Sequence, residues 1–134
     1  IWNSNRPKHS TEVVLVINSS EDSEQRVIDQ NIKTYSEVKN WIKNHEDSLL
    51  RFFVINEENL PKKYAGAGLA RKIGMDQATW RFNSLNITNG IIVSLDADAT
   101  IKENYLLLEI IVVFSISTMK MEELLNGLTQ NKKV

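Results

Sequence analysis

Residues 12–23, EVVLVINSSEDS, decide the fold, because a short run of mostly β-branched residues ends in a polar turn that leads into a helical pattern. The run from Glu12 to Ile17 predicts a buried strand that ends near Asn18. From about residue 23 to residue 44 the apolar residues follow the helical period, which predicts an amphipathic helix. A short side-chain oxygen of Asp22 or Ser23 is expected to cap that helix.

The same alternation of strand and helix continues along the chain. LLRFFVI, residues 49–55, predicts a second strand, and the stretch 56–68, with its proline and glycines, predicts a break in regular structure. A second helix is expected over about 68–82, and IIVSL, residues 91–95, predicts a third strand. Strands that alternate with helices are typical of an α/β fold with a mainly parallel sheet and crossover helices. The three strands are therefore expected to be buried neighbours.

Composition places the chain among single globular domains. It has 134 residues, of which 42% are apolar and 25% charged, and its formal net charge is -1. This charge and the lack of a basic run give no reason to expect a nucleic-acid partner. No transmembrane segment is expected, because the most apolar stretch, 105–116, contains Glu109 and is too short to span a bilayer. The cytoplasm is the expected location, with the inner face of a membrane as the alternative.

Two aspartates follow the third predicted strand in the sequence GIIVSLDADAT, residues 90–100. Asp96 and Asp98 occupy alternate positions, so in an extended backbone both carboxylates point to the same side. Like charges held together repel unless a cation lies between them. A hard cation such as Mn²⁺ or Mg²⁺ fits that role when it also carries a phosphate-bearing substrate. The alternative is a solvated turn or a helix cap.

Ligands of open parallel sheets bind outside the carboxyl ends of the strands, where the predicted loops meet. AGAGLAR, residues 65–71, contains a Gly-x-Gly, but Arg71 stands where a dinucleotide fingerprint requires a third glycine. A glycine at a helix start, such as Gly68, and an arginine one turn later suit a pyrophosphate or ribose, although a flexible loop with a surface arginine is the alternative. Asn18 and Asp22 predict a base or ribose pocket, or else a plain turn.

Three segments, VVLVINSSEDS, GAGLARKIGMDQA and NGIIVSLDADA, together resemble successive blocks of a family 2 glycosyltransferase with the GT-A fold. The resemblance covers about residues 11–106, and the whole chain, 1–134, is expected to be one partial donor-binding domain with a divergent tail over 107–134. It implies a three-layer, Rossmann-like nucleotide-diphospho-sugar transferase. The copy is expected to be incomplete, because neither the family's earlier strand nor its catalytic base is visible.

The resemblance implies metal-assisted transfer of a sugar from a nucleotide-diphospho-sugar to an acceptor hydroxyl, for example on a glycan or a lipid-linked sugar. It places Asn18, Asp22, Gly68, Arg71 and Asp96 at the donor. It places the Mn²⁺ or Mg²⁺ on Asp96 and Asp98. The alternative is a non-catalytic remnant or a weak nucleotide-binding module without transferase activity.

Overall fold

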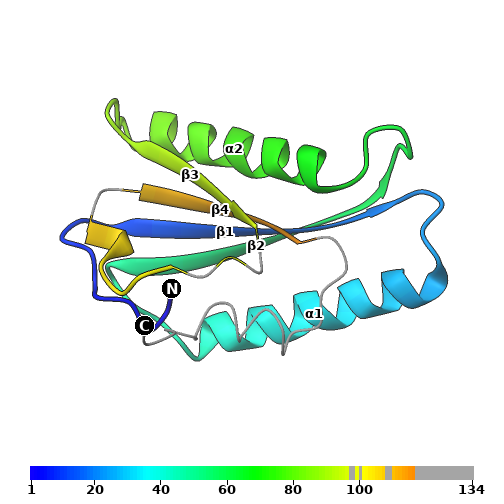
Figure 1. Ribbon diagram of the computed structural model, residues 1–134, viewed down its shortest axis with the longest axis horizontal. Helices are drawn as coiled ribbons and strands as arrows, with labels where there is room; N and C mark the ends of the chain where they lie inside the picture. Colours follow the sequence, from blue (N-terminus) through cyan, green and yellow to red (C-terminus); the bar gives the residue numbers. More distant parts are fainter. Residues whose placement is uncertain (97–98, 100, 108–109, 117–134) are drawn as a thin grey trace.

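The computed structural model describes residues 1–96, 99, 101–107 and 110–116, which form an α/β fold with a four-stranded sheet (Figure 1). The sheet has the order β2-β1-β4-β3, and every neighbouring pair is parallel. In chain order the elements are β1 (Thr11–Ser20), α1 (Gln25–Lys43), β2 (Leu50–Leu60), α2 (Ala67–Ser84), β3 (Ile91–Asp96), the short 3-10 helix η1 (Tyr105–Leu107) and β4 (Ile110–Ile116). The predicted α/β class with a parallel sheet is confirmed.

The first strand is buried on both faces, because α1 lies over one face of the sheet and α2 over the other (Figure 1). Alternate residues of a strand point to opposite faces. Leu15 packs in the cluster that includes Val38 of α1, whereas Val16 packs in the cluster that includes Ala70 of α2. Five consecutive residues, Val13–Ile17, are 0% exposed. The uninterrupted apolar run is what a strand covered on both sides requires.

The predicted strands belong to one sheet, but they are not all direct neighbours. β1 pairs with β2 on one side, with Leu15 opposite Val54, and with β4 on the other, so that β4 separates β1 from β3. Residues 110–116 therefore form an inner strand, although the sequence resemblance did not extend to them. The third strand is also less buried than expected, since Ile91 is 45% exposed.

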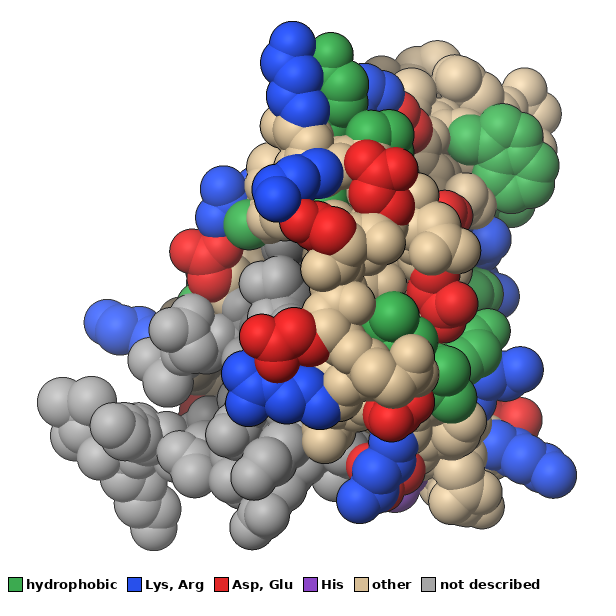
Figure 2. All heavy atoms as spheres, turned by 90° about the vertical axis from the view of Figure 1, so that its right-hand side faces the viewer, with side chains coloured by type: hydrophobic (Ala, Val, Ile, Leu, Met, Phe, Trp, Pro, Cys, Tyr) green, Lys and Arg blue, Asp and Glu red, His purple; other side chains and the backbone are tan. Residues whose placement is uncertain are grey.

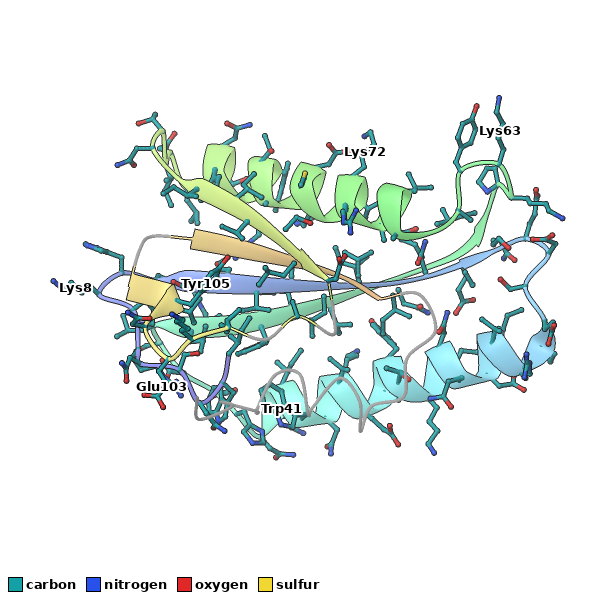
Figure 3. All side chains as sticks on the ribbon, viewed as in Figure 1. Lys8, Trp41, Lys63, Lys72, Glu103 and Tyr105 are labelled. Carbon is teal, nitrogen blue, oxygen red and sulfur yellow. The ribbon has the colours of Figure 1, made fainter. Side chains whose placement is uncertain are left out.

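A cluster of aromatic residues packs at the amino-terminal end of the sheet. Trp2 lies 5.5 Å from Trp41, measured between ring centroids, and His45 stacks on Trp41 at 4.2 Å. His45 is partly exposed and packs against both tryptophans. Trp80 on α2, by contrast, is 61% exposed. Figure 3 shows Trp41 near the carboxyl end of α1.

The element bounds differ from the predictions where polar residues intervene. β2 continues to Leu60, beyond the break expected after residue 55. Glu24 is the N-cap of α1, and no side chain makes a capping hydrogen bond there, so the predicted cap was wrong. On α1, Ile32 is 47% exposed while Asn31 is 1% exposed. Within the described ranges, no helix has both the length and the apolar character that a bilayer crossing requires.

Candidate functional site

The predicted site residues lie along the carboxyl edge of the sheet, the edge at the right of Figure 1. Asn18 is near the end of β1, Asp22 follows in the next turn, and Asp96 ends β3. Gly68 and Arg71 lie in the first turns of α2. Asp98 lies outside the described residues. Figure 2 looks onto this edge and shows acidic and basic side chains interspersed over it, without a continuous patch of either sign.

Asn18 ties β1 to the start of α2 through its side chain. It is 3% exposed, and its Nδ2 donates a hydrogen bond of 3.1 Å to the carbonyl oxygen of Gly66. Its backbone carbonyl accepts a bond of 3.0 Å from Nδ2 of Asn31 on α1. Its Oδ1 has no hydrogen-bond partner among the described residues. A buried acceptor without a partner costs free energy, so this oxygen is a place where a ligand donor or a water is favourable.

The backbone at the start of α2 requires glycine at Gly66. This residue is the N-cap and has φ 125° and ψ -169°, a conformation that side chains strongly disfavour. No side chain caps the helix. A Cβ built on Gly66 or on Gly68 would meet no atom within 4 Å, so the surface over the first turn is open. The strict requirement for glycine therefore falls two residues before the predicted site residue Gly68.

A pocket of about 190 Å³ opens between the end of β1 and the start of α2. Its volume is below the ~300–1,000 Å³ of sites that enclose a drug-sized ligand, so it suits one base or one ribose and not a whole sugar nucleotide. Most of its lining groups are small or polar, and Val27 of α1 adds one apolar surface. The lining residues are Asn18, Ser19, Ser20, Ser23, Val27, Ala65 and Gly66.

Asp22 and Lys62 join the turn after β1 to the loop after β2. Nζ of Lys62 lies 2.6 Å from Oδ2 of Asp22, and Oγ of Ser20 donates a bond of 2.5 Å to Oδ1 of the same carboxylate. The hydrogen bond from Lys62, and then that from Ser20, hold the pKa of Asp22 below its usual value, while Asp22 raises the pKa of Lys62. Lys62 could not be predicted from a local pattern, because its partner is 40 residues away. The predicted Asp22 thus lies beside the pocket with its charge already neutralised.

Arg71 of α2 and Asp96 of β3 form an ion pair between Nη2 and Oδ1. The two side chains are 41% and 60% exposed, so the pair is open to solvent and to ligands. Exposed pairs typically contribute about 0–1 kcal/mol, which makes an exchange of partners inexpensive. The structure therefore brings together two residues that the sequence predicted separately for phosphate and for metal.

The described ranges contain no group of three or more His, Asp or Glu side chains that could hold a metal ion. Asp96 offers a carboxylate, the ligand type that Mn²⁺ and Mg²⁺ prefer. Because Asp98 lies outside the described residues, the paired-carboxylate site stays a prediction.

Comparison of the chain with protein-family models, with curated proteins and with solved structures finds no match.

Proposed function

We propose that this chain is the donor-binding portion of a sugar-nucleotide-dependent glycosyltransferase with a three-layer GT-A architecture. The resemblance of three successive sequence blocks to family 2 glycosyltransferases motivates the proposal. Under this hypothesis the carboxyl edge of the sheet holds the nucleoside diphosphate, and the sugar is transferred with metal assistance to an acceptor hydroxyl.

The pocket at Asn18 is the observation that carries the proposal. Its lining suits a nucleoside, because hydroxyl and amide groups match the donors and acceptors of a base or ribose. The unpartnered Oδ1 of Asn18 could accept an N–H or O–H bond that nothing in the described part of the chain supplies. A bound nucleoside would remove the cost of leaving that buried oxygen unpaired.

The start of α2 lies beside this pocket and suits the phosphates. Backbone amides and the positive end of the helix dipole favour anions at such a terminus. Gly66 and Gly68 leave the surface over the first turn open, so a phosphate can approach the backbone closely. Arg71, one turn further along, carries a guanidinium that can bind two phosphate oxygens at once.

The ion pair of Arg71 and Asp96 suggests how the site exchanges partners. In the free chain the two groups neutralise each other. A metal-bound diphosphate offers anionic oxygens to Arg71 and a cation to Asp96, so both charges can be satisfied again. When bound to Asp96 and Asp98, Mn²⁺ or Mg²⁺ would supply Lewis-acid stabilisation of the leaving diphosphate.

Calorimetry with uridine and guanosine diphosphates tests the proposal. Mn²⁺ should strengthen binding, and Asp98→Asn should remove that gain. The matched control is Asp76→Asn on the outer surface of α2, where the carboxylate pairs with Lys72 and has 64% exposure. Asn18→Leu should weaken binding with and without metal. Equal affinity with metal, with chelator and in Asp98→Asn would contradict the metal-assisted donor site.

A weak nucleotide-binding module without transferase activity is the alternative, and the closed Arg71–Asp96 pair favours it because both charges are satisfied without a ligand. A radiolabelled donor assay with a panel of acceptors separates the two. Acceptor-dependent transfer that is lost in Asp98→Asn supports the transferase, whereas metal-dependent binding without transfer supports the module.

A further inference from the structure

The outer edge of β2 is the surface that the proposed function leaves unexplained. β2 is 11 residues long and lies at the end of the sheet order, so no strand of the described ranges pairs with its outer side. Edge strands expose unpaired N–H and C=O groups, and most proteins protect them with charges, prolines, bulges or short length. The middle of β2, Phe52–Ile55, has four apolar residues and none of these protections.

One face of β2 is only partly covered. The odd-numbered residues of β2 lie opposite the residues of β1 that face α2. Because α2 itself packs against β1, β3 and β4, it leaves this face of β2 incompletely covered. Phe53 is covered by the guanidinium of Arg81, which lies 4.2 Å from the ring centroid, but the residue stays partly exposed, as does Ile55. The residues on this face are Arg51, Phe53, Ile55 and Glu57.

A hollow runs beside the same strand on the side of α1. One pocket of about 440 Å³ and another of about 380 Å³ share Ile42, Glu46, Phe52 and Phe53 among their lining residues. The two pockets therefore form one groove between α1 and β2. A strand added to the outer edge of β2 would extend the floor of this groove.

The sequence of β2 is complementary to itself. RFFVINE, residues 51–57, begins with a cation, has an apolar centre and ends with an anion. In an antiparallel pair, two residues directly opposite each other both direct their N–H groups toward the partner strand, or both direct them away from it. Because the N–H direction alternates along a strand, opposed residues of two identical strands must both be odd-numbered or both be even-numbered. Arg51 can therefore lie directly opposite Glu57 of a second copy, but not opposite Glu58. This register is centred on Val54.

We infer that β2 pairs with β2 of a second copy of this chain, antiparallel and across a two-fold axis at Val54. The register sets Arg51 opposite Glu57 twice and Phe53 opposite Ile55 twice, all on one face. Opposite charges and aromatic–β-branched pairs are the cross-strand contacts that stabilise antiparallel strands. The axis is perpendicular to the sheet, so the two grooves beside α1 meet across it.

The pairing is closed, because each copy uses its β2 edge once and the interface is the same patch on both copies. It forms a dimer with one continuous sheet and not a fibre. The residues that carry it are separate from the pocket at Asn18, so the dimer and the proposed nucleotide site can be tested independently.

Sedimentation equilibrium on the full chain tests the dimer. The wild type should be a monomer–dimer system, and Glu57→Arg should raise the dimer dissociation constant about tenfold or more, because two attractive pairs become repulsive. Glu58→Arg makes the same charge change one residue away, opposite an apolar residue, and should change the constant by less than about threefold. Circular dichroism verifies the fold of each variant.

A spin label provides a readout that does not depend on charge variants. The chain has no cysteine, so Val54→Cys gives a single labelling position. Labels at Val54 should lie close enough across the axis to broaden each other's spectra, whereas labels at Ile91→Cys, on the opposite edge strand, should not. A wild type that stays monomeric, an assembly larger than a dimer, or equal effects of Glu57→Arg and Glu58→Arg would overturn the inference.

Discussion

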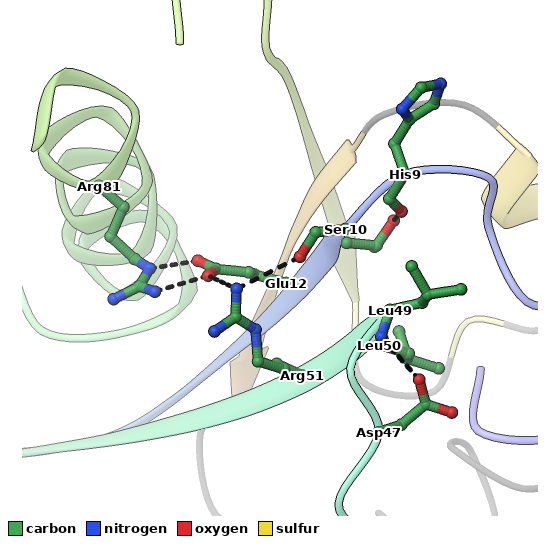
Figure 4. A network of polar contacts seen from close by, with 9 residues as sticks. His9, Ser10, Glu12, Asp47, Leu49, Leu50, Arg51 and Arg81 are labelled. Carbon is green, nitrogen blue, oxygen red and sulfur yellow. Dashed lines mark hydrogen bonds and ion pairs between the residues drawn. The ribbon is translucent and has the colours of Figure 1, made fainter. Parts of the chain in front are cut away.

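Replacing Glu12 with glutamine should destabilise the fold, because its carboxylate is the acceptor of a largely buried ion-pair network (Figure 4). The side chain is 5% exposed. Arg81 donates to it through both Nε and Nη2, the second bond measuring 2.5 Å to Oε1. Nη2 of Arg51 lies 3.7 Å from the same Oε1. These contacts join β1 to α2 and to β2 at the amino-terminal end of the sheet.

The magnitude follows from the burial of the two main partners. Hydrogen bonds to charged groups are worth about 1.5–3 kcal/mol each, and removing one partner of a fully buried pair costs about 3–5 kcal/mol. Arg81 is 21% exposed, so water can partly replace the lost acceptor. We expect Glu12→Gln to lower the free energy of unfolding by about 2–3 kcal/mol. The hydrogen bonds that Arg81 donates to the Glu12 carboxylate also raise the pKa of Arg81.

Urea denaturation measures this change, with an unchanged m-value as the sign that the unfolding transition is the same. The matched control is Glu37→Gln on α1, where the carboxylate is 41% exposed and lies 3.9 Å from Lys33. Its loss should cost less than about 0.5 kcal/mol. The measurements should be repeated at several protein concentrations, so that association does not enter the difference. A Glu12→Gln variant as stable as the Glu37→Gln control would refute the reasoning.

Two further changes test the backbone and the pH dependence. Gly66→Ala should lower the free energy of unfolding by about 1–3 kcal/mol, because the φ of 125° at this position is strained for a residue with a side chain. Gly68→Ala inside α2 should leave the free energy of unfolding unchanged or raise it by up to about 1 kcal/mol. Equal urea midpoints for the two variants would contradict this. Although burial alone would raise the pKa of Asp47, hydrogen bonds from Arg6 and the Leu49 amide lower it. The contribution of the Asp47 carboxylate to stability is thus complete above about pH 4–5 and is lost as the pH falls below that range. Asp47→Asn should therefore be less stable than the wild type at neutral pH and should approach its stability in acid. A difference between the two melting temperatures that does not change with pH would count against this.

The sequence predicted those parts of the fold that depend on local pattern. The strand at Val13–Ile17 could be recognised because a strand covered on both faces is apolar at every position. The two long helices could be recognised from spacing and from the polar segments that bound them. The position of β4 could not be predicted in this way, because an apolar segment pairs with whichever strand edge is open to it. Its place between β1 and β3 is a long-range property of the sheet.

The location of the candidate site could be predicted, because the parallel direction of the strands determines it. Parallel strands bring their carboxyl ends to one edge, which is why Asn18 and Gly66, 48 residues apart, share a hydrogen bond. The partner of each charge was not predictable. Asp22 pairs with Lys62, and Asp96 pairs with Arg71, through side chains whose directions depend on the finished packing.

The helix at α1 was predicted, but its apolar face differs from the prediction in a way that bears on function. Regular spacing predicted an apolar face throughout, and toward the amino-terminal end of the sheet this holds, since Val38 is 1% exposed. Toward the carboxyl edge the buried positions are instead polar, with Asn31 and Thr34 each 1% exposed, while Ile32 faces outward. Placing amides in a core costs stability unless they are fully bonded. Asn31 donates a hydrogen bond from Nδ2 to the backbone carbonyl of Asn18, a residue that lines the pocket. The Oδ1 of Asn31 has no hydrogen-bond partner among the described residues. A buried amide that departs from the folding pattern and contacts a pocket residue is expected where a site, and not the core, determines the residue.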